Sequence, residues 1–592
     1  MAVKSSGTIG ITTDVVAEFG GSAPHGLTEY YRGGAYVPNS SVNSSIPASG
    51  KIGLTSFYGS QNIMYFSSAT FVLEDTGVEA LIPNGGVLIG SNVFVHGTTS
   101  DPSSYSNNYN YIMSTDDGTV SNMKSWASAS LSDGTYYPYE FQNGFVYNGT
   151  RIYGSGKVGN SSVAYLTTSV LYANGTPQYY KYSASGLTLP VPEGAIAAPD
   201  GTVYCFGSGT DGTYYKGFVG QVNSIAGLGW IKTIANTSAG FHQYIYSCGA
   251  DSQSNVYSVL NPSTNGVCIV KTNSSGTIAW GRSFPAGSFG NAQFSGAGYC
   301  NKIVFDSADN GYCAAISFYS PAGSYSVPPA GYKQGILKFT SAGASSLFKY
   351  YNTLTSSYNV ISGVPIVDLA IDSDRLFFAA YNTTRASYGL VAKANTSIAV
   401  QSAIKIEYFP VGVGTISTSS SSSIVTGTGT NWDNYILEFQ SGIELLYANG
   451  VSVGIVASRD SNTQLTLLSN ASATVTNQTY YKMNYNYIDT ISVSSNTVYV
   501  TGGFTQMGWS APDTFVLKIP DTLDSYQTKV VSNYYVLRLS NGSSEATLTS
   551  DTLGTSVSFT ATATSKTATT YDLSPSTNTT IATYAANIAS LA

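Results

Sequence analysis

Few of the residue types that carry out chemistry in enzymes stand at spacings that would bring them together in this chain. There are three histidines, His25, His96 and His242, and no two are close in sequence. No HExxH, GxSxG, P-loop or zinc-ligand spacing occurs. His96 lies in a predicted strand, where a packed histidine is more common than a ligand. We therefore predict no catalytic, cofactor-binding or metal-binding residue, and no cofactor.

Carboxylates are the remaining candidates for chemistry. Glycoside hydrolysis uses two carboxyl groups about 5 to 10 Å apart, and the chain has 32 acidic residues. Glu140, Asp368 and Glu407 fall in the strand-rich part of the chain, but no known motif surrounds them. The sequence thus predicts that the chain is not an enzyme. A glycan-degrading enzyme stays open as the alternative, which an acid pair in a concave pocket would favour.

Aspartates also recur at one place in a repeated unit, the turn between its first and second strands. They are Asp200, Asp251, Asp306 and Asp372. The segment 306–311 looks like the start of a calcium loop but lacks the downstream glutamate that such a loop needs. Hydrogen bonding within tight turns is the favoured interpretation. Lysines recur on the third strand, at 271, 338, 393 and 518, where we expect outward or edge positions that block mispairing.

The repeated unit is a meander of strands. Its second strand is expected to begin near Val93, Thr150, Val203, Val256, Tyr312, Leu376 and Val498. The first six starts are 53 to 64 residues apart, and the last gap of 122 leaves room for an inserted domain. About four strands per unit at this period indicate a β-propeller, whose usual blade is roughly 40 to 50 residues long. We predict an all-β fold with a seven-bladed propeller.

Composition excludes several classes of function. Charged residues make up 10% of the chain, the net charge is -7, and there is no basic cluster, so we expect no nucleic-acid binding. No apolar run of about 18 residues occurs, so we expect no membrane insertion. The N-terminus lacks an apolar signal core, which predicts synthesis and folding in a host cytoplasm. The five cysteines are expected to be small buried hydrophobic residues.

Residues 1–59 differ from the rest of the chain. The segments 12–21, 27–34 and 54–60 each pair a threonine that suits a helix N-cap with a glycine that suits a helix stop. Such short helices are unstable alone, so we expect an arm ordered against a partner. Residues 60–86 are expected to form a strand pair that completes the last blade.

The arm carries a resemblance. EFGGSAP, LTEYYRGGAYVP and IPASGKIGLTSFYG, in this order, closely resemble an N-terminal region of structural proteins of tailed bacteriophages, including cyanophages. The resemblance covers about the first tenth of the chain, and it implies a virion protein whose arm docks on the particle. The docking residues it implies are Glu18, Phe19, Tyr30, Tyr31, Arg32, Phe57 and Tyr58.

Residues 410–486 interrupt the propeller pattern. Gly427, Gly429 and Trp432 match a GTGTxW-like turn and 460–467 match a later strand, which together resemble a small β-barrel module of phage tail and fibre proteins. The predicted order is a docking arm (1–59), blades 1–6 (60–409), an inserted barrel (410–486), the last blade (487–530) and a C-terminal β segment with tail (531–592).

These features predict a structural component of a tailed-phage virion, associated with the tail, baseplate or fibre, that contributes to host-surface binding. The long Tyr-, Ser-, Gly- and Asn-rich loops have the composition of adaptable recognition surfaces, although solvated loops without a ligand would look the same. Expected partners are other virion proteins and a host-surface glycan or protein, with several copies per particle. A capsid decoration or head fibre protein is the alternative within this class.

Overall fold

The computed structural model describes most strands and many turns of the chain. The described residues are 8–16, 26–31, 37, 45–58, 80–90, 92–100, 107–114, 120–126, 139–140, 145–159, 164–171, 177–184, 188–210, 214–223, 227–236, 244–261, 267–284, 302–318, 332–352, 366–381, 388–432, 439, 441–447, 450–494, 496–506, 510–524, 526–531, 535–544, 546, 548–551, 557–558, 561–566, 568–572 and 582–583.

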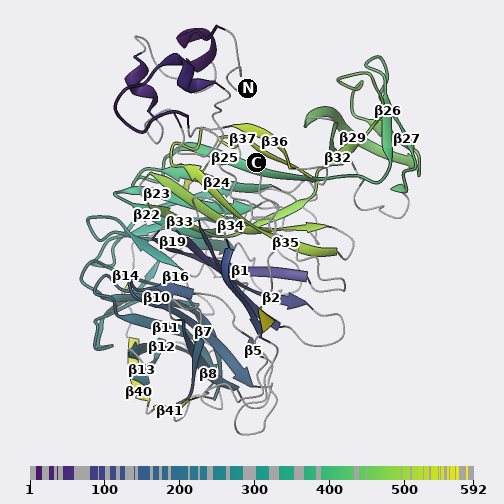
Figure 1. Ribbon diagram of the computed structural model, residues 1–592. Helices are drawn as coiled ribbons and strands as arrows, with labels where there is room; N and C mark the ends of the chain where they lie inside the picture. The colour runs from purple at the N-terminus through teal and green to yellow at the C-terminus, as the bar shows by residue number, and fades with distance from the viewer. Residues whose placement is uncertain are drawn as a thin grey trace.

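Seven antiparallel sheets form the blades of a propeller (Figure 1). The first three blades are β1 (Ala80–Ile89), β2 (Asn92–Ser100), β3 (Asn107–Ser114) and β4 (Val120–Trp126); β5 (Tyr139–Glu140), β6 (Phe145–Tyr147), β7 (Ile152–Gly159), β8 (Ala164–Leu171) and β9 (Pro177–Ala184); and β10 (Thr188–Ala197), β11 (Val203–Thr210), β12 (Tyr215–Asn223) and β13 (Gly227–Asn236).

The remaining four blades follow the same meander. They are β14 (Tyr244–Ala250), β15 (Val256–Asn261), β16 (Val267–Thr272) and β17 (Ile278–Phe284); β18 (Ile303–Phe305), β19 (Gly311–Phe318), β20 (Tyr332–Phe339) and β21 (Ser345–Asn352); β22 (Ile366–Asp372), β23 (Arg375–Tyr381), β24 (Gly389–Ala394) and β25 (Val400–Pro410); and β33 (Tyr485–Ser494), β34 (Thr497–Gln506) and β35 (Ser510–Pro520).

The predicted all-β propeller is confirmed, and each second strand begins within two residues of its expected start. These strands lie between neighbouring blades, so both of their faces are covered. Leu376, Phe377, Phe378 and Ala379 show this, because four successive residues of β23 are fully buried. Apolar contacts between successive blades therefore form the core.

The ring closes where blade 7 meets blade 1, through packing of β1 against β33, β34 and β35. The amide of Gly86 donates to Thr490 Oγ1 at 3.0 Å across this seam. A Cβ atom on Gly86 would lie 2.5 Å from Thr501, so only glycine allows the approach. The predicted closing strand pair at 60–86 needs correction in part: Ala80–Ile89 belongs to the first blade as β1, and residues 60–79 lie outside the described part of the chain.

The C-terminal segment forms a belt around the propeller, which we define as β37 to β42. These strands are β37 (Tyr535–Asn541), β38 (Thr549–Asp551), β39 (Val557–Ser558), β40 (Ala561–Lys566), β41 (Ala568–Asp572) and β42 (Ala582–Thr583). They pair in turn with the outer strands of blades 6, 5, 4, 3, 2 and 1, always antiparallel. The belt therefore runs backwards around the ring and covers an outer sheet edge at each step. One further strand, β36 (Gln527–Val531), pairs with β37.

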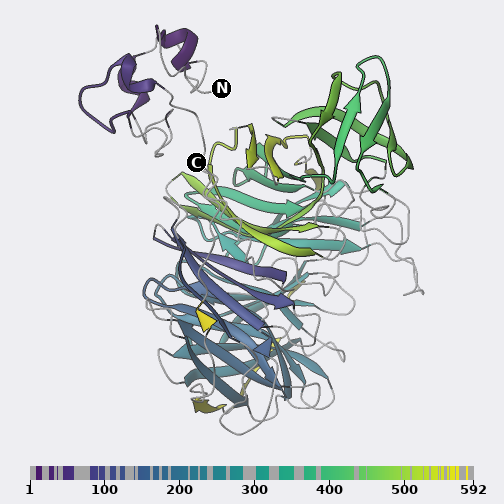
Figure 2. The same ribbon diagram turned by 45° about the vertical axis from the view of Figure 1, so that its right-hand side comes forward.

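Between blades 6 and 7 the chain forms a separate small barrel, seen at the upper right of Figure 1 and turned forward in Figure 2. Its strands are β26 (Thr415–Thr418), β27 (Ile424–Thr428), β28 (Glu444–Tyr447), β29 (Val451–Ser461), β30 (Gln464–Leu467), β31 (Val475–Gln478) and β32 (Tyr480–Lys482). Trp432 is buried at its centre, and its indole Nε1 donates to Tyr480 Oη at 2.8 Å. Gly429 in the recognised turn has φ +68°, a left-handed conformation that glycine adopts without strain.

Arg538 fixes the barrel to the propeller. Its guanidinium donates to both carboxylate oxygens of Glu407 on β25 and to both of Glu444 on β28, at 2.6 to 3.1 Å. It also stacks over the Phe409 ring at 4.8 Å. Two bidentate pairs on one planar group constrain direction as well as distance. Blade, barrel and belt thus meet at one residue.

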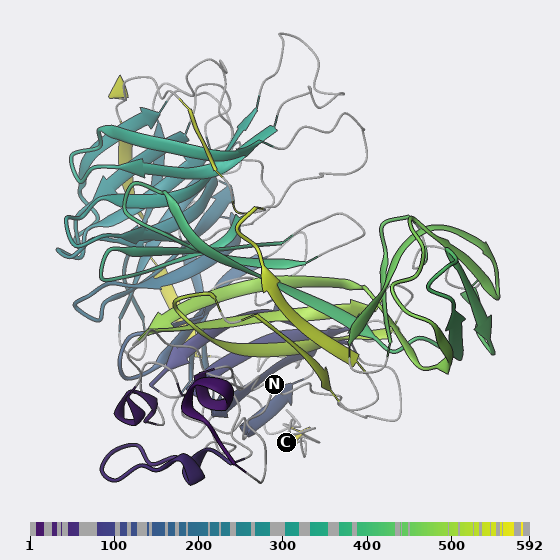
Figure 3. The same ribbon diagram turned by 90° about the horizontal axis from the view of Figure 1, so that it is seen from above.

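The described residues of the N-terminal arm form three short helices, Ile11–Val15, Leu27–Tyr30 and Leu54–Phe57, drawn in dark purple at one side of the ring in Figure 3. The expected threonine caps are wrong, because Gly10, Gly26 and Gly53 are the N-cap residues and no side chain caps any of the three. The helices pack around one cluster of buried side chains. These are Ile9, Val15, Tyr30, Val37, Ile46 and Phe57.

Candidate functional site

The innermost strands of five blades carry an irregularity at equivalent positions. In each of them the pairing register with the second strand shifts once at this level, just before the residue that pairs with the fourth or fifth residue of the second strand. The strands that show the shift are β1, β10, β14, β22 and β33. Each shift leaves one extra residue in a β-bulge: Asn84, Glu193, Tyr246, Val367 and Asp489. A bulge redirects a side chain out of the strand alternation. Two of the five are carboxylic acids.

A cavity of about 970 Å³ opens between the innermost strands of all seven blades. Its wall includes Gly85 and Gly86 of β1, Phe145–Tyr147 of β6 and Ala195–Ala197 of β10. On the other side lie residues 302–306, 367–371 and 488–493. The cavity is within the size range of small-molecule sites, about 300 to 1,000 Å³. Five aspartate and lysine side chains lie in its wall: Lys302, Asp368 and Asp489, and at the turn end of the inner strands Asp306 and Asp309.

Asp368 is a buried and fully hydrogen-bonded carboxylate. Its Oδ1 accepts from the amide of Leu369 at 2.9 Å, and its Oδ2 from the amide of Ile491 at 2.8 Å. Lys302 Nζ lies 2.8 Å from the same Oδ2. Burial raises the pKa of Asp368, and the charge of Lys302 and the two amides offset part of this effect. Asp368 therefore joins three blades, 5, 6 and 7, and is held as an anion.

Asp489 has the opposite surroundings. It is the bulged residue of β33 and lines the cavity, and its Oδ2 atom is buried without a hydrogen-bond partner. Burial, and then the negative charge of Asp368, raise its pKa well above the usual range of an aspartate. Asp368 has the cation and the amide donors, which favour its anion, so the surroundings favour protonation of Asp489 over protonation of Asp368. The site thus combines an ion pair with a carboxyl group whose surroundings favour its neutral form.

Two further titratable groups belong to the bulge level. Burial raises the pKa of Glu193, the bulged residue of β10, to about 7. His96 is buried against the Phe145 ring at 4.1 Å, and burial lowers its pKa to about 3. Its Nε2 has no hydrogen-bond partner, and a Cβ on cavity-lining Gly85 would lie 3.6 Å from this atom. A neutral, packed His96 agrees with the interpretation from sequence.

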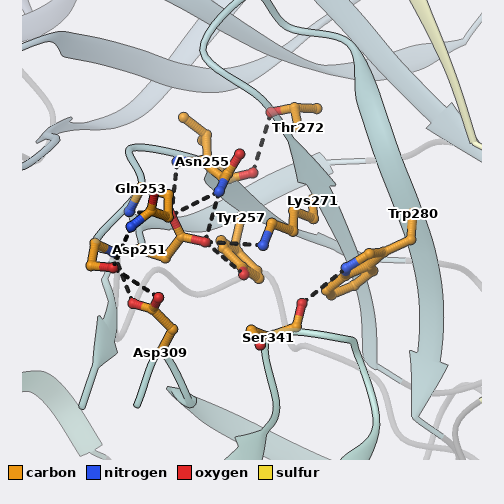
Figure 4. A network of polar contacts seen from close by, with 11 residues as sticks. Asp251, Gln253, Asn255, Tyr257, Lys271, Thr272, Trp280, Asp309 and Ser341 are labelled. Atoms are coloured by element: carbon orange, nitrogen blue, oxygen red, sulfur yellow. Dashed lines mark hydrogen bonds and ion pairs between the residues drawn. The ribbon is translucent and has the colours of Figure 1, made fainter. Parts of the chain in front are cut away.

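At the other end of the inner strands, the repeated aspartates close the turns. Asp251 Oδ1 accepts from the amides of Gln253 and Asn255 at 3.0 and 2.9 Å, and its Oδ2 accepts from Tyr257 Oη and Lys271 Nζ, both at 3.0 Å (Figure 4). Burial alone would raise the pKa of Asp251, but the hydrogen bonds from Asn255, Lys271 and Tyr257 outweigh it and lower the pKa.

The same network recurs one blade later. Asp306 accepts from the amide of Asn310 at 2.8 Å and from Tyr312 Oη at 2.9 Å, with Lys338 Nζ at 3.6 Å. The prediction that these aspartates serve turns is confirmed for Asp251 and Asp306. The prediction of outward or edge lysines is wrong for Lys271 and Lys338, because each lies over a tyrosine ring and is paired with a turn carboxylate. Among the described residues, no group of three or more His, Cys, Asp or Glu side chains could hold a metal ion.

The other candidate acids have different surroundings. Glu140 belongs to β5, and Glu407 is bound by Arg538 and by Ser540 at 2.6 Å. His25 and His242 lie outside the described residues. Asp368 is the candidate acid that the structure places in the cavity wall.

The predicted docking residues divide into three groups. Glu18, Phe19 and Arg32 lie outside the described part of the chain. Tyr30 and Phe57 are fully buried and pack edge to face at 6.3 Å, so they build the arm and are not on its surface. Tyr31, whose hydroxyl donates to the Gly50 carbonyl, and Tyr58, which is 36% exposed, remain at the surface.

Sequence reasoning missed Asp489, although it used the surrounding strand as its template. The signal was an acidic residue inside YIDTISV, a run in which Ile488 and Ile491 are buried. A charge in such a strand marks either an edge or a functional position. The bulge that aims it at the cavity depends on the pairing with β34, which the sequence does not specify.

No helix in the described ranges is long and apolar enough to cross a membrane. No known protein family matches the chain, and no curated protein does. Solved structures that resemble it include Trypanosoma rangeli sialidase with the inhibitor DANA, at 9% identity and a TM-score of 0.30, covering 80% of this chain and 94% of that one. Another is xylan β-1,4-xylosidase from Bacillus halodurans C-125, at 10% identity and a TM-score of 0.24, covering 82% and 99%.

A third is a mutant of the Bombyx mori GH32 β-fructofuranosidase in complex with sucrose, at 7% identity and a TM-score of 0.26, covering 84% of this chain and 93% of that one. The prediction that the chain is not an enzyme is withdrawn, since the solved structures similar to the chain include glycoside hydrolases. At such low identity the likeness concerns the fold alone, and it assigns neither a substrate nor a reaction to this chain.

Proposed function

We propose that this protein is a structural component of a tailed-phage virion, attached through its N-terminal arm and presenting the propeller to the host surface. The observation that carries the proposal is the arm. Its three motifs resemble those of phage structural proteins, and Tyr30, Val37, Ile46 and Phe57 of the second and third motifs belong to a core within the arm. Such a unit suits attachment, because it can dock without disturbing the propeller.

The placement we propose is the tail, baseplate or fibre. The barrel module supports this placement, because its turn at 427–432 resembles modules of tail and fibre proteins, and Arg538 holds it in a fixed direction. Partners under this proposal are neighbouring virion proteins for the arm and a host-surface molecule for the propeller.

Electron microscopy of purified particles, with an antibody against residues 80–409, tests the proposal. We expect label at the tail tip or fibres. Label over the head would replace this placement by capsid decoration, and particles without label would contradict a virion role. A variant that lacks residues 1–59 should fail to enter particles, whereas the substitutions Tyr31→Ala and Tyr58→Ala should weaken incorporation.

A second candidate function is glycan cleavage by the tail. The observation that favours it is the acid pair Asp368 and Asp489 in a concave pocket, in which the neutral Asp489 has the protonation state of a general acid. Release of reducing ends from host polysaccharide by the purified protein, lost in Asp489→Asn, would support this function. Intact polysaccharide after prolonged incubation would contradict it.

A further inference from the structure

We infer that the cavity between the inner strands is a binding site for a neutral saccharide, with the carboxyl group of Asp489 as its central hydrogen-bonding group. The inference concerns what the propeller binds, and it does not depend on where the protein sits in a virion. Particle labelling and sugar binding can therefore fail separately.

The first step of the argument is that Asp489 lacks what a structural aspartate has. Asp368, on the neighbouring inner strand, accepts two backbone amides and one ammonium group. Asp489 Oδ2 is buried and has no hydrogen-bond partner. A buried polar atom left unpaired destabilises the fold. An aspartate at a position that costs stability is more readily explained by a ligand than by the fold.

The second step is direction. Asp489 is the extra residue of a β-bulge, and the next residue, Thr490, is engaged with Gly86 across the seam. Both residues line the cavity at this bulge. The Thr490 hydroxyl is engaged by Gly86 and Thr501, so Asp489 is the one of the two with an unpaired polar atom.

The third step is charge. Lys302 and Asp368 form an ion pair at 2.8 Å, and Asp489 is neutral when it holds its proton. The bulge end of the cavity is then neutral overall, whereas Asp306, paired with Lys338, and Asp309 line its turn end. A phosphate or sulfate would meet the carboxylate of Asp368, and a cation would meet the ammonium group of Lys302. A neutral ligand with many hydroxyl groups avoids both penalties.

The fourth step is the rest of the wall. The Lys302 side chain is 38% exposed, so part of it is open to a ligand. Phe145, Tyr147 and Phe305 add aromatic surface to the lining, and Ser492 adds a hydroxyl group. Apolar walls with a few polar groups are typical of small-ligand sites. Aromatic rings beside hydroxyl and carboxyl groups suit the two faces of a sugar ring, which carry C–H and O–H groups.

The test is isothermal titration of the full-length protein with maltotriose, cellotriose, mannotriose and N,N′,N″-triacetylchitotriose, with inorganic phosphate and sialyllactose as charged competitors. We expect at least one neutral trisaccharide to bind and neither charged probe to do so. Asp489→Leu should weaken binding at least about tenfold, the factor that a lost hydrogen bond of this kind brings. Asp489→Asn should stay within about threefold of the parent, because the amide also donates and accepts.

Two variants make the test independent of folding defects. Ser492→Trp should abolish binding by filling the cavity, and Asp524→Leu, at an exposed turn outside the lining, should leave binding unchanged. The inference is overturned if no neutral trisaccharide binds at millimolar concentration, if phosphate or sialyllactose binds in their place, or if Asp489→Leu, with a thermal transition like that of the parent, binds as well as the parent.

Discussion

The two ends of the inner strands treat aspartate in opposite ways. At the turn end, Asp251 and Asp306 are each surrounded by backbone amides, an asparagine, a tyrosine and a lysine. At the bulge end, Asp489 Oδ2 is buried without any partner. An aspartate side chain thus stabilises the propeller at the turn end and destabilises it at the bulge end. Its partners, and not its residue type, decide whether it stabilises the propeller.

The largest effect on stability is expected from removing an aspartate whose carboxylate is fully hydrogen-bonded. Asp251→Ala leaves Lys271 without its anion and deprives Asn255 and Tyr257 of an acceptor, so we expect a loss of about 3 to 5 kcal/mol in the free energy of unfolding. Urea denaturation followed by tryptophan fluorescence measures it. Asp200→Ala is the matched control, because Asp200 receives the Thr202 amide in a corresponding turn but is exposed. Equal losses in the two variants would contradict this account.

At the bulge end, removing an aspartate is expected to increase stability. Asp489→Leu removes a buried carboxyl group that lacks a partner, so we expect the free energy of unfolding to rise by about 1 to 2 kcal/mol. The same urea denaturation detects it. Asp368→Leu is the informative neighbour, since it should destabilise strongly by removing the carboxylate that Lys302 and two backbone amides bind. A loss of stability in Asp489→Leu would mean that Asp489 stabilises the fold, contrary to this account.

The pH dependence of stability sharpens the comparison. The pKa of Asp251 is lowered on folding, so its contribution is present above the usual aspartate pKa and is lost as the pH falls through the folded value. The pKa of Asp489 is raised by burial and by Asp368, while Lys302 remains paired with Asp368. The folded state therefore holds a proton that the unfolded chain releases, and stability is lost as the pH rises from the usual aspartate pKa toward the folded value.

Difference measurements separate these two trends. The stability gained in Asp489→Asn over the parent should grow as the pH rises from about 4. The stability lost in Asp251→Asn should shrink as the pH falls below about 4, because the parent loses its charged partner there. Thermal melts from about pH 3 to 8 provide both curves. Parallel curves for the two variants would show that the two carboxyl groups do not differ in environment.

The sequence predicted the fold far better than it predicted the site. Strand alternation and turn residues sufficed for seven second strands, because the first six follow one another at 53 to 64 residues and the seventh repeats the pattern after the inserted barrel. The belt was not predicted, since strands such as Val557–Ser558 are only two residues long and pair through their backbone. Asp489 was missed for a related reason: its role arises from a register shift and from Asp368, which is 121 residues away in sequence. Contacts of this kind leave no local pattern.

The smallest expected effect on stability concerns exposed hydrogen bonds at the turn end. It tests whether exposure to water reduces what a hydrogen bond contributes to the free energy of unfolding. Ser252 donates to Asp309 of the next blade through its amide at 2.9 Å and its hydroxyl at 2.8 Å, and Ser307 does the same to Asp374 at 2.8 and 2.9 Å. These hydrogen bonds are exposed, so water replaces a lost hydroxyl at little cost. We expect Ser252→Ala and Ser307→Ala to cost about 0.5 kcal/mol each, measured by urea denaturation. Because the two positions repeat one geometry in neighbouring blades, unequal losses would show that blade context, and not the hydrogen bond, sets the energy.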